Sequence, residues 1–78
     1  HFKKIIDSTR EMFKLNINGL LYEYQPPMST FDLLTYLGFN TDLILVDYNG
    51  TLLPKEQWEV LSLKEGDSLE ILTLAGGG

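Results

Sequence analysis

The chain has 78 residues, with 11 Asp and Glu against 6 Lys and Arg, one His and no Cys, and its formal net charge is −5 at pH 7. This length allows one small domain, too small for most enzyme folds, and the lack of cysteine excludes disulfides and thiolate metal sites. An acidic chain without a basic cluster is poorly suited to nucleic acid or an anionic membrane, and its longest apolar run, Leu43–Val46, is too short to span a bilayer. A basic protein partner fits this composition better.

Residues 1–12 are expected to be an extension that precedes the domain. The chain begins with His1, interpreted as a tag remnant or frayed terminus, and Met12 stands directly before the first strand pattern. We interpret Met12 as the natural start. The alternative is an amphipathic arm through Phe2, Ile5 and Ile6.

The first half of the domain predicts a β-hairpin followed by a helix. Apolar and polar residues alternate over 13–17, the period of a half-buried strand. Asn18-Gly19 suits a two-residue turn, and residues 20–24 return as a strand that ends at Gln25-Pro26-Pro27.

A short helix is predicted next. Ser29 or Thr30 serves as its N-cap, with Asp32 in a weak version of the capping box. An apolar stripe faces the core, and Gly38 closes the helix in the left-handed conformation. The stripe consists of Phe31, Leu33, Leu34 and Leu37. Two turns cannot be stable alone, so this helix must pack on the sheet.

The second half predicts another hairpin and a final strand. Residues 43–48 form the most strand-like run, Asn49-Gly50 turns the chain, and residues 51–53 return until Pro54. One helical turn is expected over 55–59, with Trp58 pointing inward. Gly66-Asp67 makes a turn before the last strand, residues 68–74, and a tail follows at 75–78.

These elements predict an α+β fold of the ubiquitin-like β-grasp type. A mixed sheet of four to five strands would carry one main helix across one face and a short helical turn before the last strand. A right-handed crossover would place that last strand centrally and parallel to the first. The domain would span 13–74, with a flexible Gly-rich tail at 75–78.

The segment LILVDYNGTLLP, residues 43–54, resembles two reactive motifs but fits neither. It is similar to the aspartyl nucleophile motif of haloacid-dehalogenase-type phosphatases, yet Asn49 stands where the general acid belongs and cannot give a proton. A calcium loop would need Gly at Leu52 and Glu at Trp58. No catalytic residue and no metal site are therefore expected.

The tail is the feature that suggests chemistry. Four extended residues reach roughly 13 Å past the sheet. Because glycine has no Cβ, Gly76 and Gly77 could thread a narrow channel and present the carboxylate of Gly78 to the active site of another enzyme.

The span from Phe13 to Gly78 resembles the sulfur carrier proteins of thiamine biosynthesis, the ThiS family. The matching segments are FKLNING at 13–19, VDYNGTLLP at 46–54, KEQW at 55–58, LKEGDSLEIL at 63–72 and the terminal Gly77-Gly78. Residues 1–11 have no counterpart in this resemblance.

The resemblance implies that the chain is a protein co-substrate and not an enzyme. An adenylyltransferase related to ubiquitin-activating enzymes would join Gly78 to AMP, using ATP and magnesium that this chain does not bind. Sulfur from a donor such as a cysteine desulfurase would then give a thiocarboxylate, which thiazole synthase would consume. The family further implies bacterial cytoplasm or plastid stroma, and we expect a monomer when the chain is alone.

A partner-docking patch is expected beside the tail. If Glu23 and Asp47 face water, alternation places Leu21 and Leu45 on the same face, and Leu72 and Leu74 point outward from the last strand. We predict that Leu21, Leu45, Leu72 and Leu74 form the patch. The alternative is that these leucines pack under loops or under residues 1–12.

Three other functions remain open at this point. One is the small-subunit sulfur carrier of molybdopterin synthase, which uses the same kind of terminal thiocarboxylate. Another is a protein modifier that forms isopeptide bonds. The last is a non-covalent β-grasp interaction module with incidental glycines.

Overall fold

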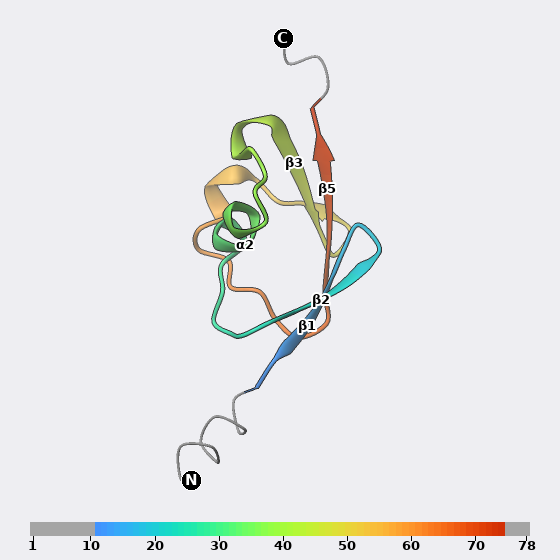
Figure 1. Cartoon of the computed structure of the whole chain (residues 1–78). Helices are drawn as coiled ribbons and strands as arrows, with labels where there is room; N and C mark the ends of the chain where they lie inside the picture. The colour runs from blue at the N-terminus through green and yellow to red at the C-terminus, as the bar shows by residue number, and fades with distance from the viewer. Residues whose placement is uncertain (1–10, 75–78) are drawn as a thin grey trace, which may run out of the picture.

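The structure of the protein is a computed structural model and describes residues 11–74. The elements in chain order are β1 (Phe13–Ile17), β2 (Leu20–Tyr24), α2 (Thr30–Tyr36), the 3-10 helix η1 (Thr41–Leu43), β3 (Ile44–Tyr48), β4 (Thr51–Leu52), the 3-10 helix η2 (Lys55–Gln57) and β5 (Asp67–Thr73). Figure 1 shows them as a sheet with α2 lying across one of its faces.

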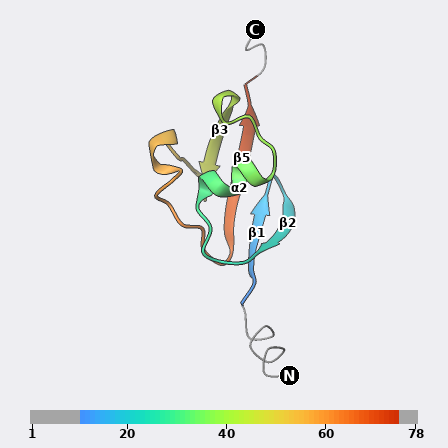
Figure 2. The same ribbon diagram turned by 60° about the vertical axis from the view of Figure 1, so that its left-hand side comes forward.

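The five strands form one mixed sheet in the order β2-β1-β5-β3-β4. The last strand, β5, is central; it pairs parallel to β1 and antiparallel to β3. This confirms the predicted central position of the last strand, parallel to the first, and the predicted β-grasp arrangement. Figure 2 shows that α2 covers only one side of the sheet, so the molecule has two layers and an uncovered sheet face.

Both predicted hairpin turns are present, and each uses a left-handed Asn-Gly pair. Asn18 and Asn49 have φ angles of 53° and 50°, which asparagine tolerates better than most residues. Their side chains also bind the central strand. The Asn18 Oδ1 accepts from the Ile71 N–H at 2.7 Å, and the Asn49 Oδ1 accepts from the Ser68 N–H at 2.8 Å. The turn residues therefore fasten both hairpins to β5.

Helix α2 begins and ends as the sequence predicted. The Ser29 Oγ accepts a hydrogen bond from the Asp32 N–H at 3.0 Å, which satisfies one of the free N–H groups of the first turn. Gly38 follows the helix with a φ of 87°, the left-handed conformation expected of a closing glycine. Leu33 and Leu34 are buried against the sheet, which gives this short helix its stability.

The core lies between α2 and the sheet. Trp58 is 2% exposed, and its Nε1–H donates to the Leu53 carbonyl at 3.0 Å, so the predicted inward position is confirmed. The other buried apolar residues are Leu15, Ile17, Tyr24, Leu33, Leu34, Ile44, Val46, Leu63, Leu69 and Ile71.

The boundaries differ from the prediction at four places. The helical turn expected over 55–59 is the shorter 3-10 helix η2, Lys55–Gln57. Leu43 belongs to η1, so β3 begins at Ile44. The predicted return strand ends one residue earlier, at Leu52. Strand β5 starts at Asp67 and ends at Thr73, one residue earlier at each end than predicted.

Parts of the predicted domain map lie outside the described residues. These are the tail, residues 75–78, and all of the expected extension except Glu11 and Met12. Within residues 11–74, no helix is both long and apolar enough to cross a membrane.

Candidate functional site

The uncovered sheet face carries a cluster of exposed leucines where β5 ends. Leu45 of β3 lies directly opposite Leu72 of β5, and both side chains are exposed. The exposed Leu74 follows β5, and its N–H donates to the Leu43 carbonyl at 2.7 Å. The structure therefore brings together three of the four residues predicted for the docking patch.

Leu52 belongs to the same cluster, although the sequence pattern did not predict it as part of the docking patch. It lies opposite Asp47 on β4, diagonally from Leu45, and is exposed. The two-residue Asn49-Gly50 turn fixes this register, so the turn itself could have placed Leu52 on the face of Asp47. We call Leu45, Leu52, Leu72 and Leu74 the leucine patch.

Leu21 lies on the same face but apart from the leucine patch. It is 67% exposed and opposite Asn16, which aligns with Ser68 of β5. Ser68 precedes Leu72 by four residues, which is roughly 13 Å along the strand. Because β2 is also the edge strand farthest from β3 and β4, Leu21 does not extend the patch.

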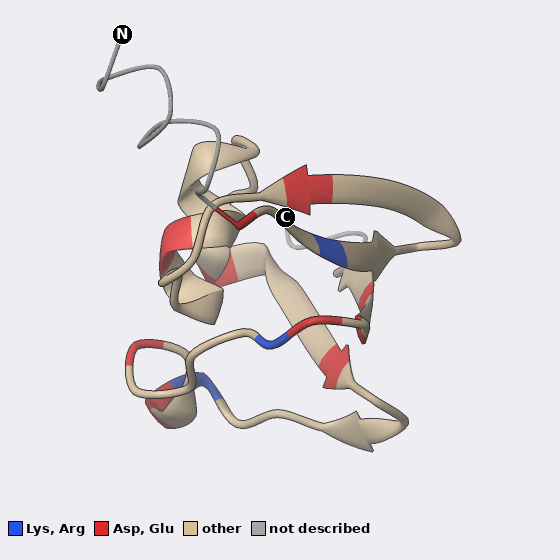
Figure 3. Ribbon diagram, turned by 90° about the horizontal axis from the view of Figure 1, so that it is seen from below, with Lys and Arg blue, Asp and Glu red and all other residues tan. Residues whose placement is uncertain are grey.

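Two acids face each other next to the leucine patch. Asp47 and Glu70 are direct cross-strand partners, and like charges in that arrangement repel. The Asp47 Oδ1 is buried and has no hydrogen-bond partner. Acidic side chains also outnumber basic ones over the described residues, as Figure 3 shows. The patch therefore has a negative border that a basic group could neutralise.

Strand β5 fixes the position at which the described part of the chain ends. It pairs with β3 up to the Ile44–Thr73 pair, so its last residues are anchored in the sheet. The tail residues Gly76, Gly77 and Gly78, predicted to carry the chemistry, lie outside the described residues. The described part therefore places the leucine patch at the end of β5, where the tail begins.

A second polar cluster, at the opposite end of β5, is structural. The buried Asp67 carboxylate accepts from the Tyr48 hydroxyl at 2.7 Å, the Lys64 N–H at 2.7 Å and the Asn49 Nδ2 at 3.2 Å. Burial and the hydrogen bond to Asp67 raise the pKa of Tyr48 to about 12. With three donors on one carboxylate, the cluster joins the second hairpin to β5. The sequence analysis had assigned Asp67 only to a turn.

The described residues also lack a candidate metal site. Among residues 11–74, no three His, Cys, Asp or Glu side chains gather in a way that could hold a metal ion.

Comparison with known proteins identifies the family. The ThiS family model matches residues 15–78. Similar proteins include uncharacterized protein ycf40 of Trieres chinensis, 37% identical over 62 residues that cover 80% of this chain and 85% of that protein. The ycf40 protein of Porphyra purpurea is 38% identical over 64 residues, covering 82% of this chain and 90% of that protein.

A larger protein contains a similar stretch. The thiazole synthase of Paramagnetospirillum magneticum is 34% identical over 65 residues, which are 83% of this chain and 20% of that protein.

The fold has a solved counterpart. The crystal structure of the thiamine biosynthesis protein ThiS from Geobacter metallireducens superimposes with a TM-score of 0.73 at 28% identity, covering 85% of this chain and all of that one. The predicted β-grasp fold is therefore confirmed by the strand topology and by the similarity to this solved structure.

Proposed function

The chain belongs to the ThiS family, and we propose that it is a sulfur carrier protein whose carrier group is the C-terminal carboxylate of Gly78. The observation that carries the proposal is that the family match runs to Gly78, directly behind a central strand that ends beside the leucine patch. In this role the chain is a co-substrate, and other proteins perform the catalysis.

Activation of the carboxylate is the first step that we propose. A free C-terminal carboxyl group has a pKa near 3.3–3.7, so Gly78 is ionised at neutral pH and resists nucleophiles. An adenylyltransferase would attach AMP from ATP to Gly78 and release pyrophosphate, with magnesium held by that enzyme. The acyl-adenylate then has a good leaving group.

Sulfur transfer follows. The terminal sulfur of a persulfide, supplied by a cysteine desulfurase or a similar donor, attacks the acyl carbon of Gly78, and AMP leaves. Cleavage of the sulfur–sulfur bond by a thiol leaves a thiocarboxylate on the carrier and a disulfide on the donor side. The absence of cysteine in this chain fits, because no internal thiol competes for the activated acyl group.

The leucine patch is the surface that we propose for docking the activating enzyme. Contiguous exposed apolar residues beside acids are typical of a protein interaction site. The Asp47–Glu70 pair would receive a basic side chain of the partner, which would relieve the repulsion between the two carboxylates. Docking there would aim the tail at the partner's active site.

The comparisons favour thiazole formation as the destination of the sulfur. A protein named thiazole synthase contains a stretch similar to most of this chain, and the solved ThiS neighbour is described as a thiamine biosynthesis protein. We therefore propose thiazole synthase as the acceptor. Membership of the ThiS family supports plastid stroma or bacterial cytoplasm as the compartment that we propose.

Mass spectrometry of the intact chain tests this function. After incubation with ATP, magnesium, the adenylyltransferase and a sulfur donor, the mass should rise by the difference between sulfur and oxygen. The matched control lacks Gly77-Gly78 and should neither form the adenylate nor lose stability. An unchanged mass of the full chain, with an adenylyltransferase that activates its own carrier, would refute the proposal. Co-purification with thiazole synthase, and not with a molybdopterin-synthase large subunit, would assign the pathway.

A further inference from the structure

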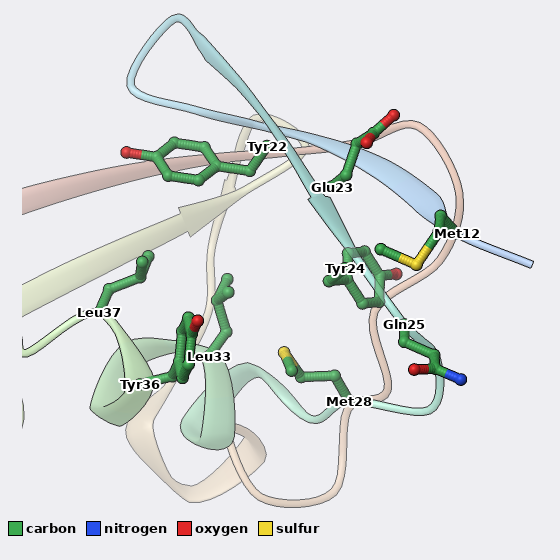
Figure 4. A pocket seen from close by; sticks show the side chains of 9 residues that line it. All are labelled: Met12, Tyr22, Glu23, Tyr24, Gln25, Met28, Leu33, Tyr36 and Leu37. Carbon is green, nitrogen blue, oxygen red and sulfur yellow. The ribbon is translucent and has the colours of Figure 1, made fainter.

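A groove lies on the other layer of the molecule, between β2 and α2. Its volume is about 320 Å³, within the range of small binding pockets. Tyr22 and Tyr24 line it from β2, Leu33 and Tyr36 line it from α2, and Met28 lies between the two elements (Figure 4). Tyr36 is 81% exposed, so an aromatic ring stands open to solvent at the rim.

The groove adjoins an unpaired strand edge. Strand β2 is at the end of the sheet, and no strand of the described residues pairs with its outer side. Because the turn after Ile17 has two residues, Ile17 and Leu20 form a hydrogen-bonded pair. Along β1 and β2, hydrogen-bonded pairs then alternate with pairs that are not hydrogen-bonded to each other. The backbone N–H and C=O groups of Leu21 and Glu23 therefore point away from β1, toward the open edge.

One of the tyrosines that line the groove has a buried polar atom without a partner. Tyr24 is 5% exposed and lines the groove, but its hydroxyl makes no hydrogen bond. Burial, with smaller effects from Asp67 and Glu65, raises the pKa of Tyr24, so the hydroxyl keeps its proton at neutral pH.

These features together define the occupant. Free backbone groups at regular spacing are matched by another extended backbone, and neither a helix nor a small molecule can satisfy them in register. Side chains of an added strand that lie beside Tyr22 and Tyr24 would point into the groove. The exposed charges of β2 and α2 are Glu23 and Asp32, so basic ends on the added strand are favoured.

We propose that the edge of β2 and the adjoining groove bind an extended peptide segment of another protein, with apolar residues at alternate positions and basic residues at its ends. The segment adds to the sheet as a sixth strand beside β2. This inference does not depend on the sulfur-carrier function, because the groove and the leucine patch are formed by different strands of the sheet.

A synthetic peptide tests the proposal on the full chain. The probe alternates valine and threonine and carries a lysine at each end, and its binding is followed by NMR of the isotope-labelled protein. Saturable shifts are expected at the amides of Leu21 and Glu23 and along α2. A peptide of the same composition with its valines in one block should bind about tenfold more weakly.

N-methylation of the peptide isolates the backbone contribution. Two peptides are made, one methylated on the odd-numbered amides and the other on the even-numbered amides. Since only alternate amides of an added strand face β2, one methylated peptide should lose binding and the other should keep it. Equal binding by both, or shifts confined to the leucine patch, would overturn the proposal.

Two variants complete the test. Tyr36→Ala removes an exposed groove side chain and should weaken peptide binding about tenfold, whereas Leu72→Asp on the opposite face should leave it unchanged. Concentration-dependent self-association through β2, or contacts between the Tyr36 ring and residues 1–10 in the free chain, would show another occupant and overturn the assignment to a partner peptide.

Discussion

Leu72 and Leu21 are exposed leucines on the same sheet face that differ in their distance from the tail. Leu72 is 59% exposed and lies in the leucine patch, whereas Leu21 is 67% exposed and lies beyond it. We predict that Leu72→Asp lowers kcat/KM for adenylation roughly tenfold, because it puts a charge into a desolvated contact. Leu21→Asp, the matched control, should change it less than about twofold.

Stability separates this effect from misfolding. Both leucines are exposed, so each substitution should alter the free energy of unfolding by less than about 0.5 kcal/mol. Circular dichroism and urea unfolding check this point. Unfolding of Leu72→Asp would show that the residue is part of the core. Equal losses of activity in both variants would contradict the exclusion of Leu21 from the leucine patch.

Tyr48 makes the stability of the domain depend on pH in the alkaline range. Its pKa is raised from 10.0 to about 12 in the folded state. Between these two values the unfolded chain loses a proton that the folded chain keeps, so the unfolded state binds fewer protons. The free energy of unfolding should therefore fall as the pH rises from about 10 to about 12.

Tyr48→Phe tests the assignment. This variant should show a shallower fall in the free energy of unfolding over the same window, measured by urea unfolding at several pH values. Some slope should remain, because burial also raises the pKa of Tyr24. An unchanged slope would show that ionisation of Tyr48 is not the cause of the fall.

At the scale of elements, local chemistry explains what the sequence could predict. The hairpins follow from Asn-Gly pairs, and the limits of α2 follow from Ser29 and Gly38, since these residues act on their own neighbours. The 3-10 turn η1 was missed, although Asn40 caps it through the Asp42 N–H at 3.0 Å. A single Asx cap is too common in loops to identify an element.

Long-range registers explain what the sequence could not predict. The exposure of Leu45, Leu72 and Leu74 followed from alternation along a strand. The separation of Leu21 from them depends on the parallel register of β1 and β5, which no local signal sets. The groove likewise depends on where α2 packs relative to β2, which no local signal sets.

The second hairpin depends on Asn49 in two separable ways. Its side chain makes two hydrogen bonds, to the Ser68 N–H and to the Asp67 carboxylate, and its backbone is left-handed. Asn49→Gly removes the side-chain hydrogen bonds without opposing the left-handed backbone and should lower the free energy of unfolding by about 1–3 kcal/mol. Asn49→Ala should cost about 1 kcal/mol more, because alanine resists the left-handed conformation.

Chemical unfolding of the two Asn49 variants under identical conditions gives the comparison. A larger loss in the glycine variant than in the alanine variant would indicate that chain entropy, and not left-handed strain, dominates at this turn.

At the scale of the whole molecule, the sheet separates two surfaces. The leucine patch lies over β5, β3 and β4, and the groove lies beside β2 at the other edge. The uncovered face carries the patch, while the groove opens between the sheet and α2 (Figures 2 and 4). Because the surfaces do not overlap, an enzyme docked at the tail would leave the edge of β2 free for a second partner.

Charge links the stability of the domain to its proposed docking. The chain carries a net charge of −5, and Glu70 stands opposite Asp47 next to the leucine patch. Glu70→Gln removes the repulsion between these carboxylates and should raise the free energy of unfolding by up to about 1 kcal/mol. The same change removes a site for a basic partner group, so kcat/KM for adenylation should fall and depend less on salt.

Glu56→Gln is the matched control for charge. Glu56 is exposed on η2, which is not one of the strands that carry the patch, and either substitution changes the net charge from −5 to −4 by removing one carboxylate. If docking depends on the Asp47–Glu70 pair, only Glu70→Gln should become more stable and lose kcat/KM for adenylation. Urea unfolding measures the stability, and adenylation assays across a salt series measure kcat/KM. If both variants lost activity equally and neither became more stable, general attraction between an acidic carrier and a basic enzyme would explain the association, and the Asp47–Glu70 pair would have no specific part in it.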